Sequence, residues 1–390
     1  MNVRKVLFYH ENFPAGGAER VTIDIANYIS NRGYEVYVLA SNINEGNYSQ
    51  LTVLKLPDKV SVTEASGIQY VVDVIHSFDI DIFVLPVCSF IPLLEVVKRQ
   101  TCCKLVFALH SVPFWEVLYS FYIKKARARG DFFKTLEWWM LTYPKTMWLK
   151  KYDPPIRVRH IKIYELVDAY TVLCESYKKD LLEKIGMTKS GDKIYVIPNS
   201  EKVIPQVNLD KKKQLLFVGR MSYDDKRADR LIHIWHKIYR KIPDWELVLV
   251  GDGDERTRLE TLVAKLHLER VVFAGYHADV RRFYNDSLIL CLTSNYEGWP
   301  LVLTEAQANG VIPVAFNCTA GVREILEPTG VNGVLIPPFS KKRYAKELLA
   351  LLQNPQKCRE IQKNVIMKAR NYSPDKIGEK WYALFERLCD

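Results

Sequence analysis

Short apolar runs alternate with longer amphipathic runs along this chain, and the alternation restarts after a polar pause near the middle. In the first half, seven apolar runs have the length of buried strands: Val3–His10, Glu35–Ser41, Leu51–Leu56, Ile80–Pro86, Lys104–His110, Ala169–Cys174 and Lys193–Pro198. Helix-like segments lie between several of them, and Glu19–Asn31 is an example that stops before Gly33. Alternation of strands and helices predicts βαβ units and a parallel sheet.

The pause is the polar segment Ser200–Lys213, which we interpret as a linker. Six strand-like runs follow it: Gln214–Arg220, Glu246–Gly251, Val271–Gly275, Leu288–Ser294, Ile312–Asn317 and Gly333–Pro337. Helices are predicted at Lys226–Lys241, Glu255–Leu266, Leu301–Asn309, Lys341–Gln353, Pro355–Asn371 and Pro374–Leu388. We therefore predict an α/β protein with two Rossmann-like, doubly wound domains, residues 1–200 and 201–373. The last helix, in 374–390, is expected to cross back to the first domain.

Composition excludes several classes of protein. With 390 residues, 48% of them hydrophobic, the chain can bury large cores and is not of the disordered type. Met1–His10 lacks the apolar stretch of a signal peptide, and Ile82–Leu94 is too short and proline-broken to span a bilayer. The eight cysteines form no CxxC pair, which fits a reducing cytosol and predicts neither a zinc site nor a disulfide framework.

Ligands of open α/β sheets bind beyond the carboxyl ends of the strands, so the motifs that follow strands carry the functional signal. The first strand leads into Pro14–Arg20, where Gly16 and Gly17 precede a helix. Such glycines let backbone N–H groups approach a phosphate, although an ordinary βα turn has the same pattern. His110 ends another strand, where a histidine is either functional or merely structural.

A second group of motifs follows strands of the second half. Gly219 and Arg220 end its first strand and Lys226 lies six residues later, which suits a diphosphate clamp but is also common on surfaces. Acidic and basic neighbours such as Arg227 and Arg230 predict a partly solvated face there. The segment Val250–Arg256 resembles a dinucleotide fingerprint but lacks its third glycine, so a tight turn is the better interpretation.

The most informative segment is Ser294–Ala306. It leaves a buried strand and enters a helix predicted to start near Pro300, which would leave the first N–H groups, those of Leu301 and Val302, unpaired at the ligand edge. Glu297 precedes this helix and Glu305 lies inside it. Two carboxylates at this spacing are common by chance. Their combination with a glycine, a proline and flanking strands is not.

Taken together, these segments resemble retaining glycosyltransferase family 4, of the bacterial polysaccharide and glycolipid type, with its GT-B fold of two Rossmann-like domains facing across a cleft. The resemblance is carried by the Gly16-Gly17 loop, Val218–Arg220 with Lys226, and Glu297 and Glu305 in an EX7E motif. Ile197–Asn199 and Gly321–Ile325 add further matches in the family's order.

The resemblance implies roles for these residues. Gly16, Gly17 and Gly219 would lie at the donor phosphates, and Arg220 and Lys226 would neutralise the diphosphate leaving group. Glu297 would contact sugar hydroxyls, Glu305 the ribose, and His110 the reacting centre. The donor would also be contacted by Gly298, Trp299, Pro300, Leu301, Val302 and, at the base, Tyr276. Two departures are Trp299, where phenylalanine is usual, and Ser111, where an aspartate frequently follows the histidine.

The implied activity is transfer of a hexose or N-acetylhexosamine from a nucleotide sugar to a glycan or lipid-linked acceptor in cell-surface polysaccharide synthesis. A UDP-sugar is the donor that the family resemblance favours. We expect no cofactor and no metal, because Asp79-Ile-Asp81 enters a strand and Asp252-Gly-Asp254 lies in the segment interpreted as a tight turn. Cations and helix N-termini can stabilise the leaving diphosphate instead. The alternatives are a non-catalytic protein of the same fold that binds sugar nucleotides and, with less support, a nicotinamide-dependent dehydrogenase.

Positive charge is concentrated in one segment. The chain has a net charge of +10, and 111–162 alone holds eleven Lys/Arg residues against four Asp/Glu residues, together with twelve aromatic residues. Such interleaving suits an anionic membrane surface, and a packed helical insertion is the alternative. We expect a protein of the cytoplasm, peripheral on the inner face of its membrane. Single-stranded nucleic acid would also suit this pattern, but no nucleic-acid-binding motif accompanies it.

Overall fold

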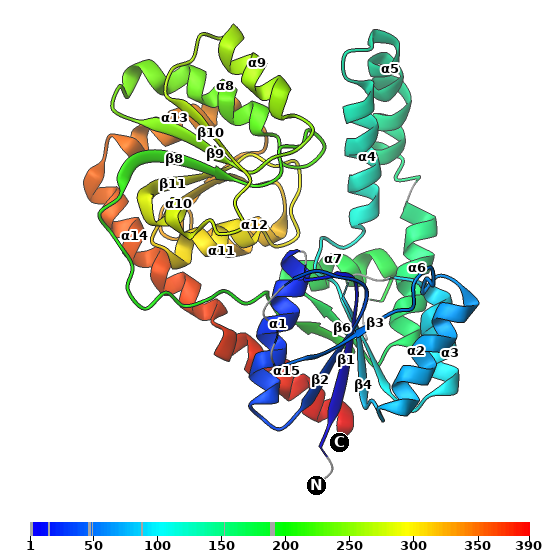
Figure 1. Cartoon of the computed structure of the whole chain (residues 1–390). Helices are drawn as coiled ribbons and strands as arrows, with labels where there is room; N and C mark the ends of the chain where they lie inside the picture. The colour runs from blue at the N-terminus through cyan, green and yellow to red at the C-terminus, as the bar shows by residue number, and fades with distance from the viewer. Residues whose placement is uncertain are drawn as a thin grey trace. The chain divides into compact units, whose positions relative to one another are not determined.

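The computed structural model describes residues 3–14, 16–45, 48, 50–86, 89–151, 153–187 and 192–390 (Figure 1). The chain divides into two compact units. Unit 1 comprises Met1–Phe114, Asp153–Ser200 and Ser373–Asp390, and unit 2 comprises Trp115–Tyr152 and Glu201–Tyr372. None of the helices in the described ranges combines the length and apolarity needed to cross a bilayer.

Unit 1 is built on a seven-stranded parallel sheet with the order β3-β2-β1-β4-β5-β6-β7. Its strands are β1 (Lys5–Phe13), β2 (Glu35–Ile43), β3 (Thr52–Lys55), β4 (Ile82–Pro86), β5 (Lys104–Ala108), β6 (Ala169–Val172) and β7 (Ile194–Val196). Its helices are α1 (Gly17–Ser30), α2 (Ala65–Ser77), α3 (Ile91–Gln100), α6 (Asp153–Leu166), α7 (Glu175–Ile185) and α15 (Pro374–Cys389). Each of these strands coincides with a predicted apolar run to within three residues at either end.

Helices cover both faces of this sheet. Figure 1 shows α1 and α15 together on one side and α2 and α3 on the other, and both pairs pack in contact. The α1 side buries Val21, Ile25 and Ile29 at the spacing expected for an apolar helical face, and Trp381 and Phe385 of α15 join them. The final helix therefore completes the core of unit 1, although it follows unit 2 in the sequence.

Unit 2 has a six-stranded parallel sheet with the order β10-β9-β8-β11-β12-β13. The strands are β8 (Lys212–Val218), β9 (Glu246–Val250), β10 (Val271–Gly275), β11 (Ser287–Leu292), β12 (Ile312–Phe316) and β13 (Val334–Ile336). The helices are α8 (Ala228–Ile238), α9 (Arg256–Lys265), α10 (Arg281–Asp286), α11 (Leu301–Ala308), α12 (Ala320–Leu326), α13 (Lys341–Leu352) and α14 (Pro355–Ala369), with 3₁₀ turns η3 (Tyr239–Lys241) and η4 (Arg370–Tyr372). The short helices α10 and α12 are not predicted by the sequence periodicity, which needs more turns to show a face.

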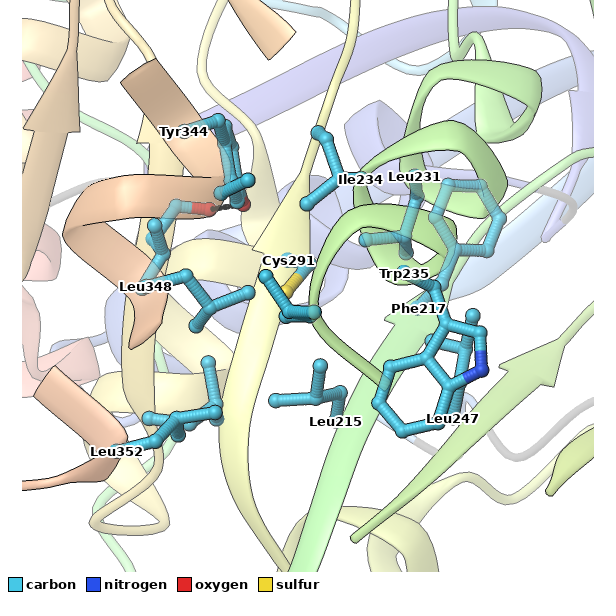
Figure 2. Close-up of a cluster of buried hydrophobic side chains, with 14 of the residues drawn as sticks. Leu215, Phe217, Leu231, Ile234, Trp235, Leu247, Cys291, Tyr344, Leu348 and Leu352 are labelled. Atoms are coloured by element: carbon cyan, nitrogen blue, oxygen red, sulfur yellow. Dashed lines mark hydrogen bonds between the residues drawn. The ribbon is translucent and has the colours of Figure 1, made fainter. Parts of the chain in front are cut away.

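The core of unit 2 lies between its sheet and the helices α8 and α13. Figure 2 shows Trp235 of α8 beside Leu215, Phe217 and Leu247 of the sheet, all fully buried. On the α13 side, Tyr344 is also fully buried, and its hydroxyl donates to the Val314 carbonyl at 2.6 Å. Large apolar side chains thus fix the sheet, so the loops at its carboxyl edge start from a rigid frame.

The glycines of the incomplete dinucleotide fingerprint serve backbone packing. A Cβ on Gly251 would lie 2.0 Å from the Gly219 carbonyl oxygen, and one on Gly253 would lie 2.6 Å from that of Met221. Both glycines also have positive φ values, 128° and 150°. The loops that follow β8 and β9 can touch because glycine has no side chain at these two positions. This agrees with the interpretation of Val250–Arg256 as a tight turn.

The basic aromatic segment differs from its expected assignment. The sequence predicts that 111–162 interrupts the first domain, but residues 115–152 group with unit 2 and α6 groups with unit 1. The reason is a contact between aromatic side chains, because Tyr122 stacks on Tyr296 of unit 2 with ring centroids 5.6 Å apart and an interplanar angle of 14°. Arg129 also forms an ion pair with Glu255 of unit 2.

Candidate functional site

Lys226 and Glu297 form the centre of the candidate site in unit 2. The Lys226 ammonium lies 2.8 and 3.0 Å from the two carboxylate oxygens of Glu297, although 71 residues separate them. The Ser294 hydroxyl donates to Glu297 at 2.6 Å. Burial disfavours the charge of Lys226, but the Glu297 carboxylate outweighs it and holds the pKa of Lys226 above its usual value. A fixed cation and a fixed carboxylate therefore stand side by side beyond the strand ends.

Asn295 and Arg230 hold together the two loops that carry this pair. The Asn295 amide donates to the Asp224 carbonyl at 2.6 Å, and its backbone N–H donates to the Asp225 carbonyl at 2.7 Å. The Arg230 guanidinium donates to the Thr293 carbonyl and to the Asn295 side chain. Arg227 and Arg230 are each only 8% exposed, so the predicted partly solvated face is wrong for the arginines, whereas Asp224 and Asp225 are partly exposed as predicted. These arginines are buried because the carbonyls and carboxylates of the two loops satisfy them.

Arg220 lies at the end of β8 with its guanidinium largely in solvent. It donates to Asp225 at 2.9 Å. Burial would raise the pKa of Asp225, but hydrogen bonds from Ser222 and the nearby charges of Lys226 and Arg220 hold it below its usual value. The carboxylate therefore stays ionised and orients the guanidinium, which remains accessible to an anionic ligand.

A hollow of about 380 Å³ adjoins Arg220. Its lining comes from the ends of β8 and β9 and from the loop after β10: Val218, Gly219, Arg220, Val250, Gly251, Asp252, Tyr276, His277 and Val280. Tyr276 is 75% exposed, so its ring is available for stacking. A flat aromatic ligand attached to a diphosphate would fit this combination of glycine-lined wall, tyrosine and cation.

Helix α11 begins where the sequence predicts, with Pro300 as its N-cap residue. The first intrahelical bond runs from the Leu303 N–H to the Pro300 carbonyl at 2.9 Å, so the N–H groups of Leu301 and Val302 precede it. Glu305 lies one turn further on and accepts a 2.7 Å hydrogen bond from the buried Tyr284 hydroxyl. The predicted order of Glu297, helix start and Glu305 is therefore present along the loop after β11 and helix α11.

His110 follows β5 in unit 1, and its orienting partner is Asn199. The His110 Nδ1 lies 2.8 Å from the Asn199 side-chain oxygen, which can only accept, so Nδ1 carries the proton and Nε2 presents a lone pair. Burial lowers the pKa of His110 to about 4, against the opposing effect of the Asn199 hydrogen bond. His110 is thus a neutral imidazole held in one tautomer, and an amide takes the place of the carboxylate that is frequent in the family.

Gly16 and Gly17 lie at the start of α1, Gly16 as the N-cap residue and Gly17 as the first helical residue. The Glu19 carboxylate folds back to 2.8 Å from the place where a Gly16 Cβ would stand, and it lies 3.5 Å from His10 Nδ1. Burial would raise the pKa of Glu19, but the hydrogen bond from His10 helps to hold it below its usual value. A hollow of about 620 Å³, whose lining includes His10 and Glu19, opens beside them.

Comparison with known proteins assigns the family. A family model described as Glycosyltransferase Family 4 matches residues 15–200, and one described as Glycosyl transferases group 1 matches residues 199–368. The chain is a family-4-like glycosyltransferase. Its relatives include an uncharacterised glycosyltransferase of Haemophilus influenzae, 28% identical over 97% of this chain and 99% of the relative. The lipopolysaccharide 1,6-galactosyltransferase of Salmonella typhimurium is 25% identical over 46% of this chain and 51% of its own length.

Solved structures share the fold of this glycosyltransferase. Anabaena HepE, in complex with UDP and glucose, superimposes with a TM-score of 0.73 at 19% identity, covering 98% of this chain and 100% of HepE. Staphylococcus aureus TarM superimposes with a TM-score of 0.70 at 14% identity, over 98% of this chain and 99% of TarM. The two Rossmann-like domains of the glycosyltransferase are therefore of the GT-B type, as predicted. Within the described residues, no group of three or more His, Cys, Asp or Glu side chains is placed to hold a metal ion.

Most of the residues that orient the candidate site residues are not identifiable from motifs. Asp225, Tyr284 and Asn199 act through hydrogen bonds to residues that are distant in sequence or common in composition. Asn199 alone had a signal, because it ends the Ile197–Asn199 match. Trp299 is 5% exposed and packs edge-on against Tyr372 with ring centroids 5.1 Å apart, so its larger ring extends into the protein core.

On the ribose-binding role that the family resemblance implies for Glu305, replacing Tyr284 with phenylalanine should weaken nucleotide binding about fivefold, because Glu305 loses the hydrogen bond from the Tyr284 hydroxyl. The measurement is the dissociation constant of UDP by calorimetry. Tyr239→Phe, in the same unit and outside the site, is the matched control and should bind as the wild type does. An unchanged dissociation constant in Tyr284→Phe would remove Tyr284 from the site.

Proposed function

We propose that this glycosyltransferase transfers a hexose or N-acetylhexosamine from a UDP-sugar to a glycan or lipid-linked acceptor in cell-surface polysaccharide synthesis. The observation that carries the proposal is the contact between Lys226 and Glu297 beside the accessible Arg220. A nucleotide sugar carries sugar hydroxyls next to a diphosphate. A carboxylate can accept hydrogen bonds from the hydroxyls, and neighbouring cations can bind the diphosphate. In unit 2, the Glu297 carboxylate contacts Lys226, and Arg220 borders a hollow that is proposed to take the base.

The proposed chemistry needs no metal ion. When the bond between the sugar C1 and the diphosphate oxygen breaks, negative charge develops on the leaving diphosphate. Lys226, Arg220 and the N-terminus of α11 are groups that can stabilise that charge without reorganising. Lys226 would exchange part of its contact with Glu297 for the phosphate, which frees Glu297 to accept hydrogen bonds from the sugar hydroxyls.

Retention of the anomeric configuration is part of the proposal. The acceptor hydroxyl attacks C1 from the face that the diphosphate leaves, a C1–O bond forms as the old one breaks, and the acceptor proton passes to the leaving phosphate oxygen. His110 is neutral at physiological pH, so it would act on the sugar as a hydrogen-bonding group and not as a charge. The acceptor is proposed to bind unit 1, where the hollow beside His10 and Glu19 offers polar partners.

Two findings support UDP over other nucleotides and a surface polysaccharide as the product. HepE has been solved with UDP-glucose, at 19% identity to this chain. For the polysaccharide product, the relatives of this chain include an amylovoran biosynthesis glycosyltransferase of Erwinia amylovora, 27% identical over 57% of this chain. A lipid-linked acceptor lies in a membrane, so we also propose that the enzyme works at the cytoplasmic face of the membrane.

The test is hydrolysis of a panel of UDP-, GDP- and ADP-sugars in the presence of EDTA. We expect release of UDP from at least one UDP-sugar, about tenfold faster than release from the other nucleotides, and no loss of rate with the chelator. Arg220→Ala should reduce that rate, whereas Arg281→Ala, an exposed arginine paired with Asp279, is the matched control. Binding of UDP-sugar without hydrolysis or transfer to any acceptor would favour the non-catalytic alternative.

A further inference from the structure

The hairpin formed by residues 115–151 exposes an apolar helical face. Helix α4 (Trp115–Ala128) ascends, Gly130 turns the chain with φ +84°, and α5 (Phe132–Glu137) returns antiparallel to α4 (Figure 1). Two π-helical turns, η1 (Trp138–Thr142) and η2 (Pro144–Trp148), extend α5. This returning arm, 132–149, exposes most of its large apolar side chains to solvent, and Trp138 is the buried exception.

Exposed apolar side chains occur along the whole length of the returning arm. Phe132 is 74% exposed, Phe133 80%, Met140 65% and Trp148 73%. The other exposed apolar members of the arm are Leu136, Trp139, Leu141, Met147 and Leu149. Water-exposed phenylalanine and tryptophan in one contiguous stretch mark an interaction surface, because scattered single residues are the norm for a soluble face.

The opposite side of the hairpin is covered by packing between its two arms and by a contact with the rest of unit 2. Trp138 is 4% exposed and packs on Phe121 with ring centroids 4.9 Å apart, and Lys125 lies 5.0 Å from the Trp138 ring centroid. Tyr122 completes this cluster by stacking on Tyr296. Phe121 and Trp138 therefore hold the two arms of the hairpin together, and Tyr122 fixes the hairpin to the rest of unit 2. The outer apolar side chains are left to meet a partner.

Cations border the exposed face. A hollow of about 310 Å³ in the hairpin is lined by four basic side chains, Lys124, Arg127, Lys134 and Lys145, against one acidic side chain, Glu137. Its remaining lining includes Trp138 and Leu141. Lys150 and Lys151 follow the end of the arm. Basic side chains around apolar and aromatic ones match a bilayer surface, where phosphates lie above the acyl chains.

We propose that the outer face of the hairpin docks on a bilayer of anionic phospholipid. The exposed aromatic and aliphatic side chains enter the boundary between headgroups and acyl chains, while the cations around the hollow hold lipid phosphates. This rests on the proposed function for its purpose, which is to keep unit 2 near a lipid-linked acceptor. The hairpin packs against Tyr296, which is next to Glu297 in the sequence. Docking of the hairpin would therefore hold the loop that carries Glu297 near the membrane surface.

The test is flotation of the purified full-length chain with vesicles of phosphatidylcholine, with and without 30% phosphatidylglycerol (about the anionic content that gives a strong surface potential). We expect retention only on the anionic vesicles and loss of most binding in high salt. Phe132→Ser/Phe133→Ser and Lys134→Glu/Lys145→Glu should each lower the partition coefficient about tenfold. Brominated acyl chains should quench the fluorescence of Trp139 and Trp148, which places the arm in the boundary.

The matched controls lie elsewhere on unit 2. Met367→Ser removes an exposed apolar side chain of α14, and Lys342→Glu/Lys346→Glu reverses two charges of α13, so both should float as the wild type does. Melting temperatures show whether each variant is folded. Equal retention on neutral vesicles, or wild-type retention of both hairpin variants, would overturn the proposal. Since no sugar is transferred in flotation, its failure leaves the proposed transferase activity standing, and the reverse also holds.

Discussion

Replacing Lys226 with methionine should lower the rate of UDP release from the donor about 10²- to 10³-fold, the usual effect of removing a charge stabiliser from a transition state. The reason is position, because the Lys226 ammonium is held 2.8 Å from the carboxylate proposed to bind the sugar. The measurement is kcat and KM with the best donor of the panel, and most of the loss should fall on kcat. Lys241→Met, an exposed lysine after α8, is the matched control.

Folding must be separated from catalysis in that variant. Glu297 is 8% exposed, so removing Lys226 alone leaves a buried carboxylate without its cation, at a cost of about 3 kcal/mol of unfolding free energy. Lys226→Met/Glu297→Gln removes both charges and should recover most of that stability while remaining inactive. If Lys226→Met turned over near the wild-type rate, the diphosphate role of this lysine would be refuted.

Replacing His110 with alanine should reduce donor turnover about 10²-fold, and Asn199→Ala should reproduce part of that loss because the imidazole is then free to rotate. The informative variant is Asn199→Asp. A carboxylate at Nδ1 favours the imidazolium and should raise the pKa of His110 by about 1–3 units from its value of about 4. Turnover of Asn199→Asp should therefore fall as pH drops below about 6, while the wild type stays flat.

The same histidine predicts how stability depends on pH. Burial depresses the pKa of His110 from 6.5 to about 4, so the unfolded chain binds its proton first as pH falls. The contribution of His110 to the free energy of unfolding is complete above pH 6.5 and is lost as pH falls through 4. Because the side chain is partly exposed to solvent, we expect this contribution to be about 1–2 kcal/mol. Thermal melts of the wild type and of His110→Gln between pH 7 and 4 test this, since a glutamine side chain cannot titrate. Parallel curves, or a flat Asn199→Asp rate profile, would contradict the assignment.

The strands of both units follow from the sequence because a buried parallel strand is a short apolar run bounded by turn residues, as Ile82–Pro86 illustrates. Long helices such as α15 follow from their apolar face in the same way. The grouping of 115–152 does not follow, because it depends on Tyr122 meeting Tyr296, a pairing 174 positions apart that leaves no local pattern. Short helices such as α12 carry too few turns for a periodicity.

Some residues of the candidate site can likewise be predicted from the sequence, and others cannot. Lys226, Glu297 and Glu305 are recognisable because each has a fixed place relative to a strand or helix end. The burial of Arg230 is not recognisable, because it depends on the Thr293 carbonyl and the Asn295 side chain reaching it from another loop. Sequence patterns locate groups that chemistry requires, whereas the neighbours that orient them are chosen by three-dimensional packing.

The path of the chain between the two units has a consequence for engineering hybrids of this enzyme. Unit boundaries fall after Phe114, Tyr152, Ser200 and Tyr372, so the units are interlaced and not strung in series. Grafting residues 201–372 from a relative would import a donor site whose Tyr296 and Glu255 counterparts must still suit Tyr122 and Arg129 of the host. The hairpin and the proposed donor site therefore have to be exchanged together.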